Sequence, residues 1–172
     1  MVGDYSKILG NLNAVKGNVN TVAGSGNHVV GHYDTIVGDI NKVAGNKNTI
    51  LGNYNSAAGN ANAVLGSYNL AAGNSNDIIG GLNAVVGSNN ALFGNANQVH
   101  QNNNAVIGNI NTVNGNANTL YGDKNAVLGS VNSITGSVNK VVGNSNILQG
   151  SGDSVKGNNN LIVGSVNKKN LV

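Results

Sequence analysis

The sequence contains no cysteine, proline, tryptophan, arginine or glutamate, and only 9% of its residues are charged. Because cysteine is missing, no disulfide bond cross-links the chain. The nine lysines are spread along the sequence without arginine or aromatic clusters, so the pattern does not indicate a nucleic-acid groove. No apolar run approaches the length of a membrane span, and the first residues show no signal-peptide pattern. The sequence therefore predicts neither nucleic-acid binding nor a membrane span.

What the sequence has instead is a seven-residue unit, Gly-x-x-Asn-x-Val-x, that repeats 24 times over residues 3–170 without an insertion. The first position is glycine in 23 units, and Gln101 is the exception. The fourth position is asparagine in 21 units and is otherwise Ser6, Asp34 or Asp153. The sixth position is valine, isoleucine, leucine or alanine in 23 units. A period this strict, combined with 40% apolar residues, indicates an ordered repeat fold rather than a disordered chain.

The unit predicts a short strand followed by a turn. A coiled coil needs two apolar positions per heptad, and this unit has one, together with a glycine that costs about 1 kcal/mol in a helix. The fourth to seventh positions alternate inward and outward as in a half-buried strand, and glycine supplies a turn with positive φ. If that corner needs positive φ, Gln101 is strained there.

Two such units are needed to close one coil. We therefore predict an all-β fold, a parallel β-solenoid of the two-sheet β-roll type with 14 residues per coil and about 12 coils. Residues 1–172 would form a single repeat domain. Its interior would hold an aliphatic ladder from the sixth position and an asparagine ladder from the fourth, with amides that bond between coils.

The sequence suggests no catalytic, cofactor or metal site. The histidines His28, His32 and His100 do not supply three ligands at a metal-binding spacing. The six aspartates do not recur in the turn, as they do in calcium-binding solenoids. No nucleophile motif or phosphate loop is present, and no segment outside the repeat is left to build a pocket. We therefore predict a protein without enzymatic activity and without a cofactor.

The outward faces are the more informative part of the pattern. Odd-numbered units line one face, called the odd face, and even-numbered units line the opposite, even face; their fifth and seventh residues point outward. The odd face has two charges, Lys7 and Asp77, whereas the even face has five lysines and two histidines. The outward residues of the odd face would form an apolar stripe along the stack. Such a stripe is longer than a soluble monomer usually exposes, so we predict an interaction face. The residues predicted to form it are Thr21, Ala23, Thr35, Val37, Thr49, Leu51, Ala63, Leu65, Ala91, Phe93, Ala105, Ile107, Thr119, Tyr121, Ser133 and Thr135.

The repeat resembles that of grass ice-binding proteins that inhibit ice recrystallisation. Residues 17–23 (GNVNTVA) and 108–114 (GNINTVN) are similar to that family's unit, and the similarity extends over essentially the whole chain. The resemblance implies a β-roll whose flat face, rich in threonine, serine and valine, contacts ice. It therefore implies an extracellular, non-enzymatic protein whose partner is an ice surface.

A second resemblance is to the head domains of trimeric autotransporter adhesins, whose heptad also pairs glycine with inward fourth and sixth residues. Those inward residues are usually serine or alanine in that family. The alternative function is therefore a cell-surface adhesin or a structural, self-assembling module. In that case the odd face would bind a repetitive surface or form a homo-oligomer.

Overall fold

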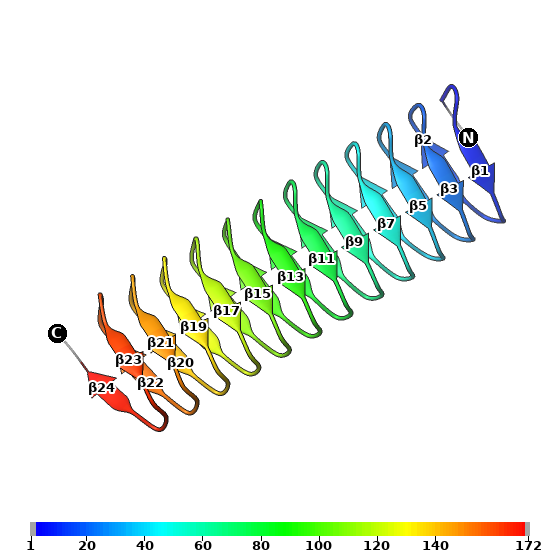
Figure 1. Ribbon diagram of the computed structural model, residues 1–172. Helices are drawn as coiled ribbons and strands as arrows, with labels where there is room; N and C mark the ends of the chain where they lie inside the picture. Colours follow the sequence, from blue (N-terminus) through cyan, green and yellow to red (C-terminus); the bar gives the residue numbers. More distant parts are fainter. Residues whose placement is uncertain (1–2, 171–172) are drawn as a thin grey trace.

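The computed structural model describes residues 3–170, which form a stack of short strands joined by tight corners (Figure 1). The strands, each of three residues, alternate between two sheets of 12 strands. The first sheet contains β1 (Lys7–Leu9), β3 (Thr21–Ala23), β5 (Thr35–Val37), β7 (Thr49–Leu51), β9 (Ala63–Leu65), β11 (Asp77–Ile79), β13 (Ala91–Phe93), β15 (Ala105–Ile107), β17 (Thr119–Tyr121), β19 (Ser133–Thr135), β21 (Ile147–Gln149) and β23 (Leu161–Val163). The second contains β2 (Ala14–Lys16), β4 (His28–Val30), β6 (Lys42–Ala44), β8 (Ser56–Ala58), β10 (Leu70–Ala72), β12 (Ala84–Val86), β14 (Gln98–His100), β16 (Thr112–Asn114), β18 (Ala126–Leu128), β20 (Lys140–Val142), β22 (Ser154–Lys156) and β24 (Lys168–Asn170).

Within each sheet, a strand pairs in parallel with the strand one coil further along. The pairing joins residues that are 14 apart: Lys7 lies opposite Thr21, and Ala14 lies opposite His28. Two seven-residue units therefore form one coil, and every outward residue has an equivalent directly above it in the next coil. The predicted all-β fold, a two-sheet parallel β-roll, is confirmed.

The core is a single layer of aliphatic side chains between the two sheets. From β1 to β23, the middle residue of the strand, at the sixth position of its unit, points inward; Val22, Ile36 and Val99 are among those with no exposed surface. Burying a valine or isoleucine side chain contributes about 1.5–3 kcal/mol. Since each coil contributes only two such side chains, stability depends on contacts between neighbouring coils.

The fourth-position asparagines form the second interior ladder, as predicted. The backbone N–H and Nδ2 of Asn41 both donate to Oδ1 of Asn27, at 2.9 and 3.1 Å, and its Nδ2 also donates to the carbonyl oxygen of Gly52 at 2.8 Å. The next rung repeats this arrangement, because Asn55 donates in the same way to Oδ1 of Asn41. A buried amide costs little when all its bonds are made. The ladder therefore fixes the stacking of coils without destabilising the interior.

Glycine at the first position allows the corners of successive coils to stack closely. A Cβ atom added to Gly73 (φ +130°) would lie 1.9 Å from the carbonyl oxygen of Gly87, in the next coil. The corner thus needs both a positive φ and the absence of a side chain. Gln101 also has positive φ, at +83°, which departs from that of the neighbouring Gly94 (+132°).

The third residue of each unit has left-handed backbone geometry, which the sequence analysis did not predict. Tyr54, Val131 and Val138 have φ of +58°, +62° and +63°. Valine and tyrosine are unfavourable in this region, so the repeat pattern gives no signal for it. The rings of Tyr54 and Tyr68 stack in parallel, with centroids 4.9 Å apart, close to the spacing between paired strands.

Candidate binding face

The structure places every residue predicted for the odd face on the same sheet. These residues come from β3, β5, β7, β9, β13, β15, β17 and β19, and they occupy the first and third positions of each strand. Their side chains are exposed or partly exposed, because the residue between them points into the core. The register aligns them into two parallel columns along the stack. The predicted residues therefore lie on one face, which also includes Asp77 and Ile79 of β11, between β9 and β13.

The first column contains the short side chains. Thr21, Thr35 and Thr49 are directly stacked on β3, β5 and β7. Further along, Ala91 lies opposite Ala105 on β13 and β15. Threonine and alanine are small, so the column is low and flat between β3 and β19, where its polarity comes from hydroxyl groups and one carboxylate. Asp77, on β11, is the charged residue of the column between β3 and β19, and Lys7 lies at its start on β1.

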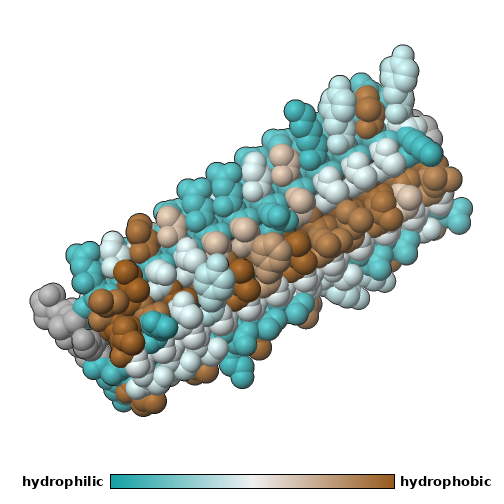
Figure 2. Space-filling model, in the orientation of Figure 1, coloured by the Kyte–Doolittle hydropathy of each residue, from teal (hydrophilic) through white to brown (hydrophobic). Residues whose placement is uncertain are grey.

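The second column is almost continuously apolar. Figure 2 shows it as a stripe along the face formed by the odd-numbered strands. Leu51, Leu65 and Phe93 are about 40–50% exposed. Parallel pairing stacks Ile79 directly on Leu65 and Phe93 on Ile79. A long exposed apolar stripe commonly marks an interaction surface, and this one lies beside the threonine and alanine column.

The even face differs mainly in charge. Lys42 and Lys140 occupy its first column, and Lys16 and Lys156 occupy its second. Ammonium groups at irregular intervals break the repetition of this surface and keep it strongly hydrated. The two faces share the same backbone geometry, so their side chains alone distinguish them.

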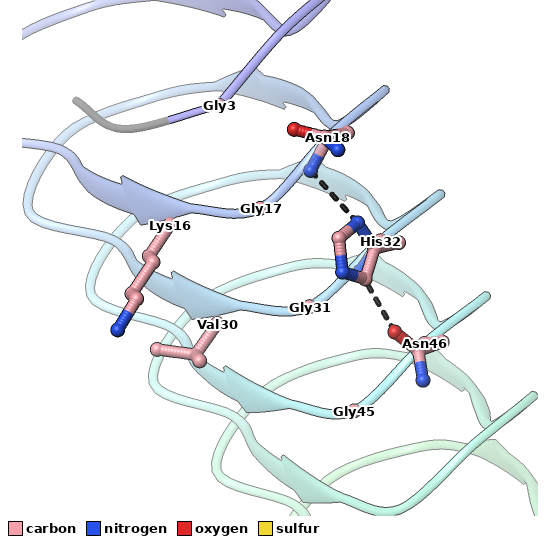
Figure 3. Close-up of a pocket in the computed structure, with 9 residues that line it drawn as sticks. All are labelled: Gly3, Lys16, Gly17, Asn18, Val30, Gly31, His32, Gly45 and Asn46. Carbon is pink, nitrogen blue, oxygen red and sulfur yellow. Dashed lines mark hydrogen bonds between the residues drawn. The ribbon is translucent and has the colours of Figure 1, made fainter.

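A shallow groove also lies along one corner near the N-terminal end (Figure 3). There the second residues of the units stacked along this corner form an exposed ladder. The backbone N–H of Asn18 donates to Nδ1 of His32 at 3.0 Å, and the backbone N–H of His32 donates to Oδ1 of Asn46 at 2.9 Å. His32 thus replaces the asparagine or serine found elsewhere in this ladder, as in the bond from the Asn46 N–H to Oδ1 of Asn60. Sequence reasoning missed this ladder, although recurring asparagine and serine after each glycine were its signal.

Within residues 3–170, no three histidine, cysteine, aspartate or glutamate side chains gather as metal ligands would. His28 lies on the outward side of β4 and His100 on that of β14, so the histidines are distributed over different strands. The part of the chain that the structure describes also contains no helix long and apolar enough to cross a membrane.

A family model described as the grass antifreeze beta roll matches residues 2–81 and 79–169. Together the two matches extend over nearly all of the 172 residues. A comparison with curated proteins found no match. The matched family has the same type of fold as the stack of coils described above.

Proposed function

The chain belongs to the grass antifreeze beta-roll family, and from this premise we propose that it binds ice and inhibits ice recrystallisation through the odd face. The observation that carries the proposal is the agreement between the family match and a flat, regular and almost uncharged face. The site consists of the two outward columns of the odd-numbered strands, from Thr21 to Thr135.

The regular spacing of the odd face favours ice as its partner. Strands in register hold equivalent side chains at a fixed spacing of about 4.8 Å along the stack. An ice surface is itself a lattice, so a partner with repeated, rigid contact points can match it over many coils. Threonine hydroxyls can hydrogen-bond to ordered water, and the neighbouring apolar column has little hydration to lose on contact. The lysine-bearing even face lacks this uniformity.

The function proposed here requires neither catalysis nor a cofactor. The partner is an ice surface, and the place of action is extracellular, where ice would form. Binding many equivalent points on one rigid face is an example of multivalent contact, in which each point contributes weakly and the sum is strong.

The test is a pair of matched double variants. Ala91→Lys with Ala105→Lys places two ammonium groups side by side on the odd face, because these residues are direct partners on β13 and β15. Ala84→Lys with Gln98→Lys places the same two groups side by side on the even face, on β12 and β14. We expect the odd-face variant to lose recrystallisation inhibition and the even-face variant to retain it.

Circular dichroism must first show the same strand content in both variants and the parent. Equal loss of activity in the two variants would contradict the assignment to the odd face. Absence of ice activity in the unmodified protein would contradict the function itself.

A second candidate function is self-association through the same face, because the apolar column exposes Leu9 (57%) and Tyr121 (50%). A structural or adhesive module would bury this column against another copy or a repetitive surface. Sedimentation distinguishes the two: an oligomer that the odd-face lysines dissociate, without ice activity in the parent, would favour this candidate.

A further inference from the structure

Asn114 and Gly115 form the only Asn-Gly pair in the sequence. The repeat explains why, since each glycine follows the outward seventh position, which is asparagine at residue 114 and rarely elsewhere. Asn114 is exposed at the end of β16 and belongs to neither asparagine ladder. Its side chain is therefore free of the bonds that hold amides such as that of Asn41.

Within residues 3–170, the backbone hydrogen bond donated by the Gly115 N–H is the longest among those of the first-position residues. The N–H of Gly115 donates to the carbonyl oxygen of His100 at 3.3 Å, whereas the equivalent bonds of Gly73 and Gly122 are 2.9 Å long. At 3.3 Å a hydrogen bond is beyond the usual range for N–H···O and is correspondingly weak. The Gly115 nitrogen is thus the least firmly held of the corner nitrogens.

Gln101 accounts for the lengthened bond. Gln101 occupies the corner one coil before Gly115. With ordinary corner geometry, a Cβ atom lies about 1.9 Å from the carbonyl oxygen of the next coil's glycine, as it would at Gly73. Gln101 avoids this clash by a changed φ of +83°, and Gly115 is at +149°. The altered φ of Gln101 and the lengthened bond of Gly115 occur at successive corners of the same row, so we attribute the second to the first.

We propose that Asn114 is a site of spontaneous deamidation, opened by the corner at Gln101. The Gly115 nitrogen gives its proton to hydroxide, which becomes water, and bonds to Cγ of Asn114. The bond from Cγ to Nδ2 then breaks as Nδ2 takes a proton from water, which regenerates hydroxide, and leaves as ammonia. Glycine has no side chain to hinder this ring closure. Water then opens the resulting succinimide to aspartate or isoaspartate, so the overall reaction consumes one water and releases one ammonia.

The modification changes the middle of the stack. Either product adds a negative charge on the even face, beside Leu128 and His100 in the same column. Isoaspartate also adds a backbone carbon, which breaks the 14-residue register between β14, β16 and β18. Since each coil contacts only its neighbours, a defect here weakens the junction between the two halves of the rod.

The experiment compares two Asn-Gly pairs in one molecule. Ala72→Asn creates a second pair with Gly73, in the same column and the same row of corners, where the protecting bond is 2.9 Å. The folded protein is incubated at mildly alkaline pH, and peptide mass spectrometry follows the conversion of each amide to acid. We expect residue 114 to react several-fold faster than residue 72.

Gln101→Gly in the same background should restore the corner and reduce the rate at residue 114 to that at residue 72. The second pair also controls for global unfolding, which would expose both sites equally. Equal rates at the two sites, or a rate at residue 114 that Gln101→Gly leaves unchanged, would overturn the proposal.

Discussion

At the scale of single residues, the two aspartates in the interior ladders are the clearest exceptions. Asp34 and Asp153 are buried, and one carboxyl oxygen of each, Oδ2, has no hydrogen-bond partner. Asp34 Oδ1 still accepts from the backbone N–H and Nδ2 of Asn48. Oδ2 occupies the position that the amide nitrogen has in the equivalent asparagines, where its two hydrogens point at hydrogen-bond acceptors. A proton on Oδ2 would restore a donor there.

Burial raises the pKa of Asp34 above its usual value, against the lowering effects of the bonds from Asn48 and of nearby His32. The folded state therefore holds a proton that the unfolded chain releases at a lower pH. The contribution of this proton to the free energy of unfolding is fully present below the unfolded pKa of about 3.8, and it is lost as the pH rises to the folded pKa.

Asp34→Asn should remove this pH dependence and raise the unfolding temperature at neutral pH, because the amide supplies the missing donors. Thermal unfolding followed by circular dichroism over a pH series measures the effect. Asp77→Asn, at an exposed position of the same sheet, is the matched control and should leave the curve unchanged. If Asp34→Asn behaves as Asp77→Asn does, the carboxyl is not the cause.

At the scale of the element, the corner stores backbone strain that the strands do not. The third residue of each unit is left-handed even where it is valine, as in Val19 and Val131. An L-residue with a branched side chain costs roughly 1–2 kcal/mol in this region. The stacked corners favour this geometry, because from Val19 onward the third residue donates its N–H to the preceding coil, as Val131 does to the carbonyl oxygen of Asn116.

Val131→Asn should therefore stabilise the protein by about 1 kcal/mol, since asparagine tolerates left-handed geometry better than valine. The side chain is exposed, so little packing is lost. Chemical denaturation would show the gain as a higher midpoint at unchanged slope. The same change at Val30, an exposed strand residue, should not stabilise, and a gain at both positions would argue against corner strain.

At the scale of the whole molecule, the rod is a one-dimensional array with a thin core. Each coil contacts the coils before and after it, so stability is close to a sum of nearest-neighbour terms. A defect within the array disrupts two interfaces, whereas a defect at the end affects a coil that already has one neighbour. The position of a substitution along the rod should thus matter as much as its chemistry.

Val64→Asp buries an unpaired charge on β9 and should lower the free energy of unfolding by several kcal/mol. Val15→Asp makes the same change on β2, in the first coil, and should cost less because that coil can separate while the rest stays stacked. Denaturation curves of the two variants provide the comparison. Equal losses would show that the rod unfolds as one indivisible unit.

The repeat was sufficient to predict the coil and its interior. A strict seven-residue period with inward residues at the fourth and sixth positions leaves few other ways to bury them, so the two sheets, the 14-residue coil and the buried Asn62 and Val64 were all predictable. It also predicted which outward residues would share a face, because period-two alternation fixes their side. It did not assign a partner to that face, because the repeat records only which residues point outward.

Other features arise from contacts between coils and could not be predicted from the repeat. Four features depend on contacts between residues that are 11 to 15 apart in the sequence. They are the left-handed third residues, the exposed ladder through His32, the unpaired oxygen of Asp34 and the lengthened bond at Gly115. No local propensity encodes them, since the same valine or asparagine would behave differently in an isolated unit. Stacking imposes them, and they become visible only when one coil lies on the next.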